Sequence, residues 1–262
     1  MKLLRRIAVL LLAAMCALTS AAYASPVPQD VIGTRYETAA SLLCKLEIMV
    51  GDGTNFNPDD NITRAEFAQI LMKTLNMGEA MTSYTPVGMF DDVPAANIFA
   101  PAIELGNEAI KLMVYAAGFQ ALAENSGGYP SGYIYAAQDV GLLKQLTGLD
   151  YAAPMTRGQA AQLCVNTLKA DMAQPASFGE NIWYEVIAGE SLLTERHNVY
   201  TVSGVVCAND VTSMWGGGNV REGDVQILAS NGLMTLEAAD TGAETMIGQY
   251  VNVYYRYDSE TE

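Results

Sequence analysis

The sequence has little of the chemistry that metal sites and disulfide frameworks need. Its 262 residues include one histidine and four cysteines. Cys16 falls in an N-terminal leader, which leaves Cys44, Cys164 and Cys207 at unrelated spacings. An odd set of this kind does not indicate a disulfide framework, and one histidine with three scattered cysteines supplies too few ligands for zinc. We therefore expect no metal and no cofactor.

Basic residues are also scarce. The chain has 14 Lys and Arg against 29 Asp and Glu, a formal net charge of −15. This balance argues against nucleic acid and anionic lipid as partners, although it is equally the ordinary surface of a soluble extracellular protein. An anionic ligand would have to be held locally, by a few placed arginines.

Outside the first 24 residues the chain has no apolar run long enough to span a bilayer. Residues 1–24 begin with three basic residues, continue through an apolar run at 7–12 and end in Ala22-Tyr23-Ala24. This pattern predicts a secretory signal peptide and a secreted protein without a membrane partner. Its removal would leave 11 Lys and Arg against 29 Asp and Glu, a charge of −18.

What the chain does contain is a capped helix start at residues 51–75, GDGTNFNPDDNITRAEFAQILMKTL. Thr63 is followed three residues later by Glu66, and an apolar run at helical spacing begins at once. The Thr63 hydroxyl and the Glu66 carboxylate are therefore expected to form a reciprocal capping box. Arg64 occupies the first helical position beside a turn that contains Gly51, Asp52 and Gly53, an arrangement suited to an anionic ligand.

The segment YETAASLLCKLEIMVGDGTNFNPDDNITRAEFAQIL, from Tyr36, resembles an S-layer homology (SLH) domain. It has that family's order of short helix, glycine turn, Gly-Thr-Phe-x-Pro-Asp loop interrupted by Asn55, and Ile-Thr-Arg-Ala-Glu-Phe helix start. The resemblance implies tandem helical repeats that bind a pyruvylated, anionic secondary cell-wall polysaccharide. It also implies an aromatic residue that stacks on the sugar; Tyr36 is the nearest candidate here, with Tyr133 as an alternative.

Further repeats are predicted downstream. Residues 33–77 form the first repeat, with helices over 36–50 and 63–77 and a linker over 78–89. Residues 90–120 resemble a shortened second repeat, with one helix over 108–119 and with Gly106 in place of the arginine. The alternative is simply two helices joined by a turn, and either form should bind sugar poorly.

A third repeat is predicted at residues 129–170. Its helices are expected over 133–143 and from Thr156, which lies 93 residues after Thr63. At that offset Arg157 matches Arg64 and Gln159 matches Glu66, so a second capping box can form.

Beyond a predicted linker at 171–180, helical spacing gives way to alternation. Residues 181–193 fit either a helix or a strand, and strands are expected over 200–207, 225–228, 233–236 and 249–257. The predicted fold class is therefore α+β: the helical SLH-type bundle that the resemblance implies, followed by a small all-β domain over 181–262. We expect this domain to be a barrel or sandwich, with an OB-like barrel as one candidate.

The spacing of polar residues from Asn55 to Glu66 also approaches that of an EF-hand calcium loop. However, the first position carries Asn in place of Asp, the sixth carries Asp60 in place of Gly, and Pro58 interrupts the loop. We favour a glycan site over a metal site. Its predicted members are Thr63, Arg64, Glu66, Gly51, Asp52, Gly53 and Tyr36 in the first repeat and Thr156, Arg157 and Gln159 in the third.

Together with these patterns, the resemblance to SLH domains implies a secreted, non-enzymatic anchoring protein of the bacterial cell wall or S-layer. Its partner would be the secondary wall polysaccharide, and the β domain could bind a protein. The sequence has one histidine, His197, and it contains no nucleophile motif such as Gly-x-Ser-x-Gly for which this residue could act as a base. The alternative hypothesis is a wall-active enzyme, or a protein-binding scaffold, whose activity lies in the β domain.

Overall fold

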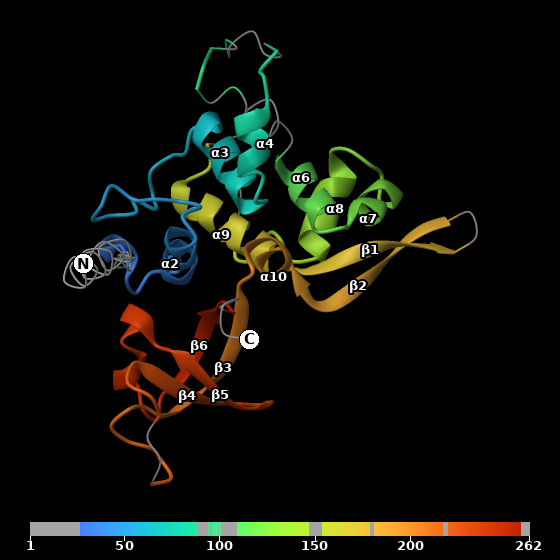
Figure 1. Ribbon diagram of the computed structural model, residues 1–262. Coiled ribbons are helices and arrows are strands. Elements are labelled where there is room, and N and C mark those ends of the chain that lie inside the picture. The colour runs from blue at the N-terminus through green and yellow to red at the C-terminus, as the bar shows by residue number, and fades with distance from the viewer. Residues whose placement is uncertain are drawn as a thin grey trace, which may run out of the picture.

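A computed structural model describes residues 27–87, 94, 96–98, 100, 109–146, 154–178, 181–216 and 220–257. Helices come first, and two antiparallel sheets follow (Figure 1). The α+β fold class is therefore confirmed. The predicted signal peptide, residues 1–24, lies outside the described residues.

A 3₁₀ turn, Gln29–Val31, precedes the first predicted repeat. That repeat contains two helices, α2 (Glu37–Lys45) and α3 (Arg64–Thr74). Both helices are confirmed, although each is shorter than predicted. The chain leaves α2 through Glu47, whose φ of 57° is left-handed. This turn sends Ile48 and Met49, which are 3% and 1% exposed, into the core.

The middle of the chain has two short helices that the sequence pattern did not predict. The predicted linker at 78–89 begins with α4 (Gly78–Ser83), so the linker prediction was wrong there. After α6 (Ala109–Ala116), the predicted helix of the second repeat, the chain turns at Gly118 and forms α7 (Gln120–Asn125). Phe90 to Val93 and Gly106, which were assigned to this repeat, lie outside the described residues.

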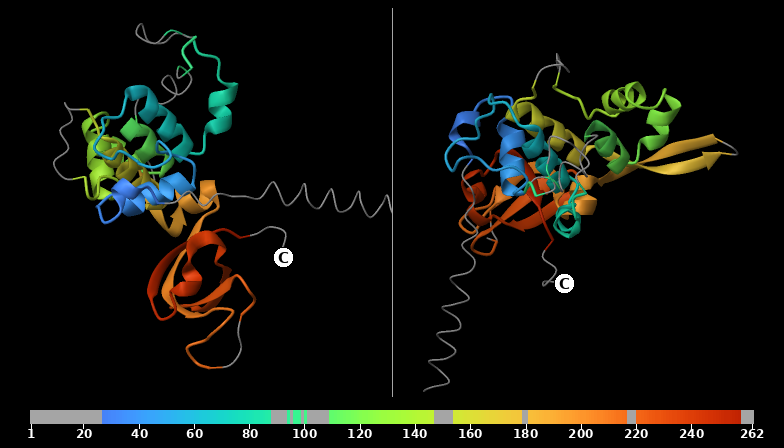
Figure 2. Two further views of the ribbon diagram at one scale, coloured as in Figure 1. Left: turned by 90° about the vertical axis from the view of Figure 1, so that its left-hand side faces the viewer. Right: turned by 90° about the horizontal axis from the view of Figure 1, so that it is seen from above.

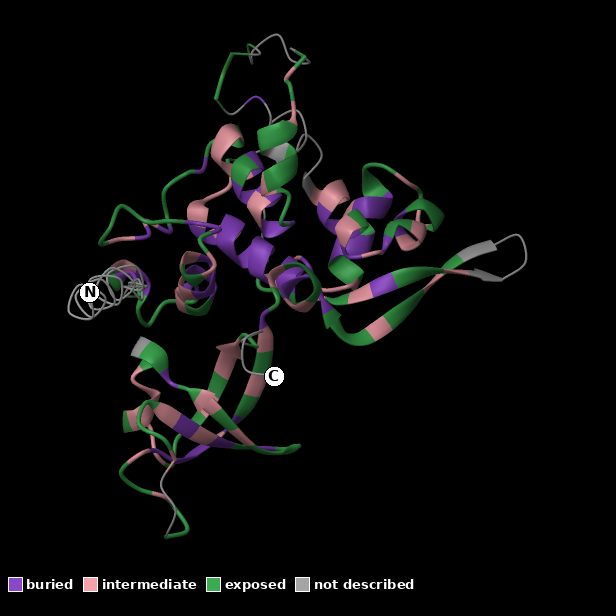
Figure 3. Ribbon diagram, in the orientation of Figure 1, coloured by how far each residue is buried: buried purple, intermediate pink, exposed green. Residues whose placement is uncertain are grey.

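The third predicted repeat contains α8 (Ser131–Asp139) and α9 (Arg157–Lys169). Helix α9 runs through the middle of the helical part, with the other helices around it, and most of its residues are buried (Figures 1 and 3). Burial raises the pKa of its Cys164 thiol to about 12. Among the described residues, Cys44, Cys164 and Cys207 are free thiols. At 13 residues α9 is the longest described helix, and none of the described helices is suited to crossing a membrane.

The prediction of a linker at 171–180 was wrong. Strand β1 (Asp171–Phe178) lies there and pairs with β2 (Asn181–Ser191) in an antiparallel hairpin. The prediction treated Pro175 as a chain breaker, but each strand of a two-stranded sheet has an unpaired edge that tolerates proline. The hairpin projects away from the helices as an arm (Figure 1). Strand β2 resolves the open choice for residues 181–193 and leads into α10 (Leu192–His197).

The C-terminal sheet has the strand order β5-β4-β3-β6, all antiparallel. Its strands are β3 (Tyr200–Ala208), β4 (Asp224–Ala229), β5 (Gly232–Glu237) and β6 (Tyr250–Tyr255), which confirms the four predicted strands. The predicted barrel or sandwich was wrong, because β5 and β6 do not pair and the described sheet stays open. Two 3₁₀ turns, Ala239–Thr241 and Ala243–Thr245, precede β6, and the hydrophobic residues that follow them cover a small core around Val206 and Val225. The sheet lies below the helices (Figure 2).

Candidate functional site: two capped helix starts

Both predicted capping boxes are present. At the start of α3, the Glu66 N–H donates to the Thr63 hydroxyl at 3.2 Å, and the Thr63 N–H donates to the Glu66 carboxylate at 2.9 Å. At the start of α9, the Gln159 N–H donates to the Thr156 hydroxyl at 3.3 Å, and the Thr156 N–H donates to the Gln159 amide oxygen at 2.9 Å. The local pattern S/T-x-x-E/Q therefore predicted the start of both helices correctly.

The two starts lie side by side although 93 residues separate them in the sequence. The chain just before α3 pairs with the chain just before α9 through the Ile62 N–H, which donates to the Met155 carbonyl at 2.9 Å. The first amides of α9 also face this segment: the Arg157 N–H donates to the Asp60 carbonyl and the Gly158 N–H to the Pro58 carbonyl, both at 2.8 Å. The structure thus brings the predicted residues of the first and third repeats together.

The Arg157 side chain ties the two repeats further. Its Nε donates to the Phe56 carbonyl at 2.9 Å and its Nη2 to the Val50 carbonyl at 2.8 Å, and its guanidinium lies 5.2 Å from the centre of the Phe56 ring. Val50 and Phe56 flank the glycine turn. Arg157 therefore holds both ends of the turn that contains Gly51, Asp52 and Gly53, and two of its donors are already used.

The turn has its own internal bonds. The Asp52 carboxylate accepts the N–H groups of Thr54 at 2.9 Å and Asn55 at 2.8 Å, and these hydrogen bonds lower the pKa of Asp52. A side chain at Gly51 would place its Cβ 2.2 Å from the Asn55 carbonyl oxygen, so only glycine fits there. Gly53 has a left-handed φ of 103°.

Sequence reasoning missed Asp30 as a member of this arrangement. Its carboxylate accepts the backbone N–H groups of Phe56 at 2.7 Å and Asn57 at 2.6 Å. Asp30 lies 26 residues before Phe56, and nothing in the local pattern links the two. Asp30 therefore holds the segment at Phe56 and Asn57, which leads from the glycine turn toward α3.

The two helix starts differ in what they leave open. The first three amides of α9 are all bonded, to Asp60, Pro58 and the Thr156 hydroxyl. At α3, by contrast, the Ala65 N–H has no hydrogen-bond acceptor within the described part of the chain. Arg64 beside it is exposed. The start of α3 therefore combines an open amide, the positive end of a helix dipole and an exposed guanidinium.

The predicted stacking residues are both buried. The Tyr36 side chain is 6% exposed and fills the space beside Gly158, where an added Cβ would lie 2.6 Å from the ring. Arg35 covers it from 4.6 Å and donates to its hydroxyl at 2.6 Å. Tyr133 is 1% exposed. Neither ring offers a free face to a sugar, so we assign both a packing role.

Part of the residue set of the calcium hypothesis forms hydrogen bonds within the fold. The Glu66 carboxylate, which would close an EF-hand loop, accepts hydrogen bonds from the N–H and the hydroxyl of Thr63. The Asn57 amide donates to Asp52. Across the described ranges, no group of three or more His, Cys, Asp or Glu side chains is arranged to hold a metal.

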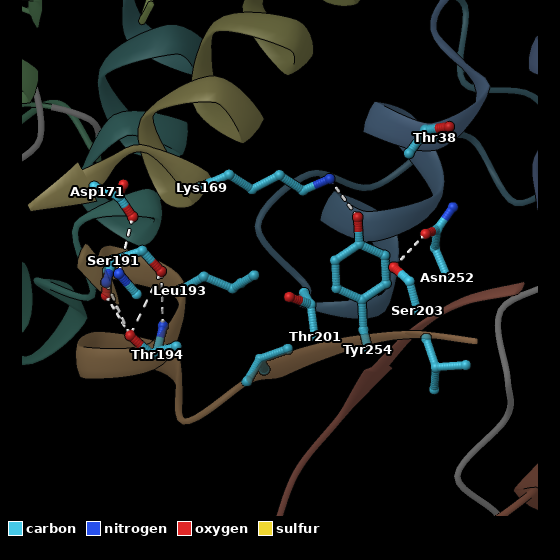
Figure 4. A pocket seen from close by; sticks show the side chains of 13 residues that line it. Thr38, Lys169, Asp171, Ser191, Leu193, Thr194, Thr201, Ser203, Asn252 and Tyr254 are labelled. Atoms are coloured by element: carbon cyan, nitrogen blue, oxygen red, sulfur yellow. Dashed lines mark hydrogen bonds between the residues drawn. The ribbon is translucent and has the colours of Figure 1, made fainter. Parts of the chain in front are cut away.

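A separate cleft of about 600 Å³ lies between the helical part and the C-terminal sheet (Figure 4). The Lys169 amine at the end of α9 reaches the Tyr254 hydroxyl of β6 and lies 4.9 Å from the centre of its ring. Ser203 donates to Asn252 at 2.6 Å on the same side. These polar groups bond to one another, and the bond between Lys169 and Tyr254 connects the helical part to the C-terminal sheet.

We expect Thr63→Ala to destabilise the protein by about 1 kcal/mol, because the Glu66 N–H loses its cap. The Thr63 hydrogen bonds lower the pKa of Glu66. Their stabilisation is therefore complete above the pKa of an unfolded glutamate, about 4.3, and is lost as the pH falls through the lower folded value. Urea unfolding at pH 7 and pH 3 measures this; Thr63→Ser, which keeps the hydroxyl, is the control. An equal loss for both substitutions would contradict the capping role.

Part of the sequence matches the model of a known domain family. The family model of the S-layer homology domain matches residues 30–68, which run from Asp30 through the first turn of α3. The chain is also 25% identical over 265 residues to the Middle cell wall protein of Brevibacillus brevis (strain 47 / JCM 6285 / NBRC 100599). That alignment covers 86% of this chain and 24% of the relative, so the chain spans about a quarter of the relative's length. No solved structure matches the chain. The chain therefore carries an S-layer homology domain over residues 30–68.

Proposed function

We propose that the protein is a non-enzymatic anchor that holds itself to the cell wall by binding an anionic, pyruvylated secondary wall polysaccharide. The observation that carries the proposal is the start of α3, where exposed Arg64 and the open Ala65 N–H share a helix N-terminus inside the SLH domain. Because the chain carries a net charge of −15, attraction of an acidic polymer must come from such a local site.

The ligand group we infer is the carboxylate of a pyruvate ketal. A guanidinium can bind a carboxylate through two parallel N–H bonds, which fixes orientation as well as charge. An open amide in the first turn of α3 adds a donor aligned with the helix dipole. The fixed glycine turn, Gly51 to Gly53, borders the loop that leads to this start and limits how the sugar can lie.

In this proposal Arg157 has a different role from Arg64. It holds the turn at Val50 and Phe56, and the α9 amides that could have met an anion are bonded to the first repeat. Thr156, Arg157 and Gln159 therefore contribute by positioning the loop. Any contact of Arg157 with the ligand uses its remaining N–H groups.

The test is a pull-down with purified wall sacculi from a bacterium that carries the pyruvylated polymer. We expect the full chain to sediment with intact sacculi and to stay in solution after chemical extraction of the polymer. Sacculi from a strain unable to pyruvylate the polymer are the matched control, and retention on them at the same level would contradict the proposal. Assay of the same mixtures for released reducing sugar checks the non-enzymatic part, because a wall-active enzyme would release it steadily.

A further inference from the structure

A second cleft, of about 630 Å³, gathers positive charge at the other end of α3. It is built from four separate segments: residues 46–48 after α2, the C-terminal end of α3, the end of α10, and the chain just after β6. Its charged and titratable residues are listed here: Lys73, Arg196, His197, Arg256 and Glu47.

This composition departs from the rest of the molecule. Residues 25–262 contain 11 Lys and Arg and 29 Asp and Glu. Three of those cations and the only histidine line this one cleft, against a single acidic side chain, Glu47. The chain as a whole is negatively charged, so its electrostatic field repels anions. The lining of this cleft carries the opposite, positive charge.

Part of the positive charge serves the fold. Helices α3 and α10 both end at the cleft, and helix C-termini carry partial negative charge. Lys73 donates to the Glu47 carbonyl at 3.1 Å, and the His197 ring lies 2.9 Å from the Thr74 carbonyl. His197 therefore meets a carbonyl at the end of α3, and Lys73 meets one in the turn after α2.

The two arginines are different. Arg196 and Arg256 are exposed, and neither guanidinium has a hydrogen-bond or ion-pair partner among the residues that the structure describes. They come from α10 and from the chain after β6, so the fold brings two unpaired forks to one cavity. A pair of this kind can bind an oxyanion through several charge-assisted hydrogen bonds.

Tyr257 gives the cleft an aromatic side. Its side chain is 69% exposed, and its ring packs edge-on against Tyr200 at 5.0 Å and Tyr255 at 5.5 Å. Because these neighbours hold the ring, it offers a fixed apolar face at the rim of the cleft. Arginine forks beside such a face suit an acidic sugar or a phosphate-bearing sugar chain.

We propose that this cleft is a second anion-binding site, and that it takes a carboxylate or phosphate group of a polyanionic wall glycan. It deepens the proposed function and rests on it for the identity of the polymer. Helix α3 has 11 residues between the two sites, or roughly 16 Å at 1.5 Å per residue. One polymer chain can therefore occupy both, and the second contact raises the apparent affinity without any change at Arg64.

The test uses the full chain in an Arg64→Ala background, which removes the first site. Isothermal titration is carried out with oligogalacturonate as the carboxylate probe, poly(glycerol phosphate) as the phosphodiester probe and neutral dextran as the control. We expect binding of at least one polyanion, none of dextran, and a fall in affinity of about tenfold when Arg196→Gln and Arg256→Gln are added. Which probe binds identifies the anion.

Arg221→Gln, which removes the same charge from an exposed position outside the cleft, is the matched control and should leave the titration unchanged. Absence of binding to both probes would overturn the proposal. So would affinity that survives the double substitution, or an equal loss in Arg221→Gln. Because Arg64 is already replaced, failure here is distinct from failure of the proposed function, which is read from the sacculi.

Discussion

Arg64→Ala is expected to reduce retention on intact wall sacculi by about tenfold or more, since a charge-assisted fork to a carboxylate is lost. The melting temperature should stay nearly unchanged, because Arg64 is exposed and a surface substitution shifts stability by about 0.5 kcal/mol or less. The capping box of α3 depends on Thr63 and Glu66 and is left intact. Sedimentation with sacculi and thermal unfolding followed by circular dichroism measure the two effects separately.

Arg64→Lys separates charge from geometry. Lysine keeps the positive charge but cannot form two parallel bonds to one carboxylate, so we expect intermediate retention. Arg35→Ala is a second control, because it removes an exposed cation that donates to the Tyr36 hydroxyl. If Arg64→Ala and Arg35→Ala lower retention equally, general charge and not a site at α3 would explain the binding.

Arg157→Ala should give the reverse pattern, a loss of stability of about 2 kcal/mol, because two carbonyls lose a charged donor. The Phe56 carbonyl is partly buried, and the Val50 carbonyl lies at the surface, so the first loss should dominate. Packing against the Phe56 ring is lost as well. Wall binding should weaken through disorder of the turn at 51–53. Urea unfolding gives the free energy.

Arg157→Lys tests the reason for that loss. A lysine amine can reach one carbonyl but cannot bridge both as the fork does, so it should recover about half of the stability. Unchanged stability in Arg157→Ala would contradict the assignment of Arg157 to the loop. It would instead free this residue for direct contact with the polymer.

Local patterns in the sequence predicted what depends on local bonds. The two capping boxes require only residues three positions apart, and both formed as predicted at Thr63 and Thr156. The contacts that distinguish the two starts are long-range, such as Arg157 to Val50, 107 residues apart, and Asp30 to Phe56, 26 apart. No spacing rule carries that information, so the sequence predicted both Arg64 and Arg157 as members of the glycan site.

Alternation of polar and apolar residues predicted the strands of the C-terminal sheet, but it could not predict that the sheet stays open. Closure depends on whether β5 and β6 meet, and the 3₁₀ turns between them lead residues such as Met246 and Ile247 across the core instead. The arm formed by β1 and β2 was missed because Pro175 suggested a break in the chain. Pro175 lies opposite Tyr184 of β2, and this pairing cannot be read from the sequence around Pro175 alone. Tyr36 resembled a sugar-stacking residue by position, but Gly158 in the third repeat admits its ring into the interior.

The central claim is that the start of α3 is open to an anion and the start of α9 is closed. Titration of the ¹⁵N-labelled protein with a pyruvylated wall fragment, followed by ¹H–¹⁵N correlation spectra, tests it at the amides themselves. The account predicts a large, saturable shift of the Ala65 amide and little change at the Arg157 and Gly158 amides, which are bonded to Asp60 and Pro58. Shifts at Arg157 and Gly158 with an unmoved Ala65 would contradict it.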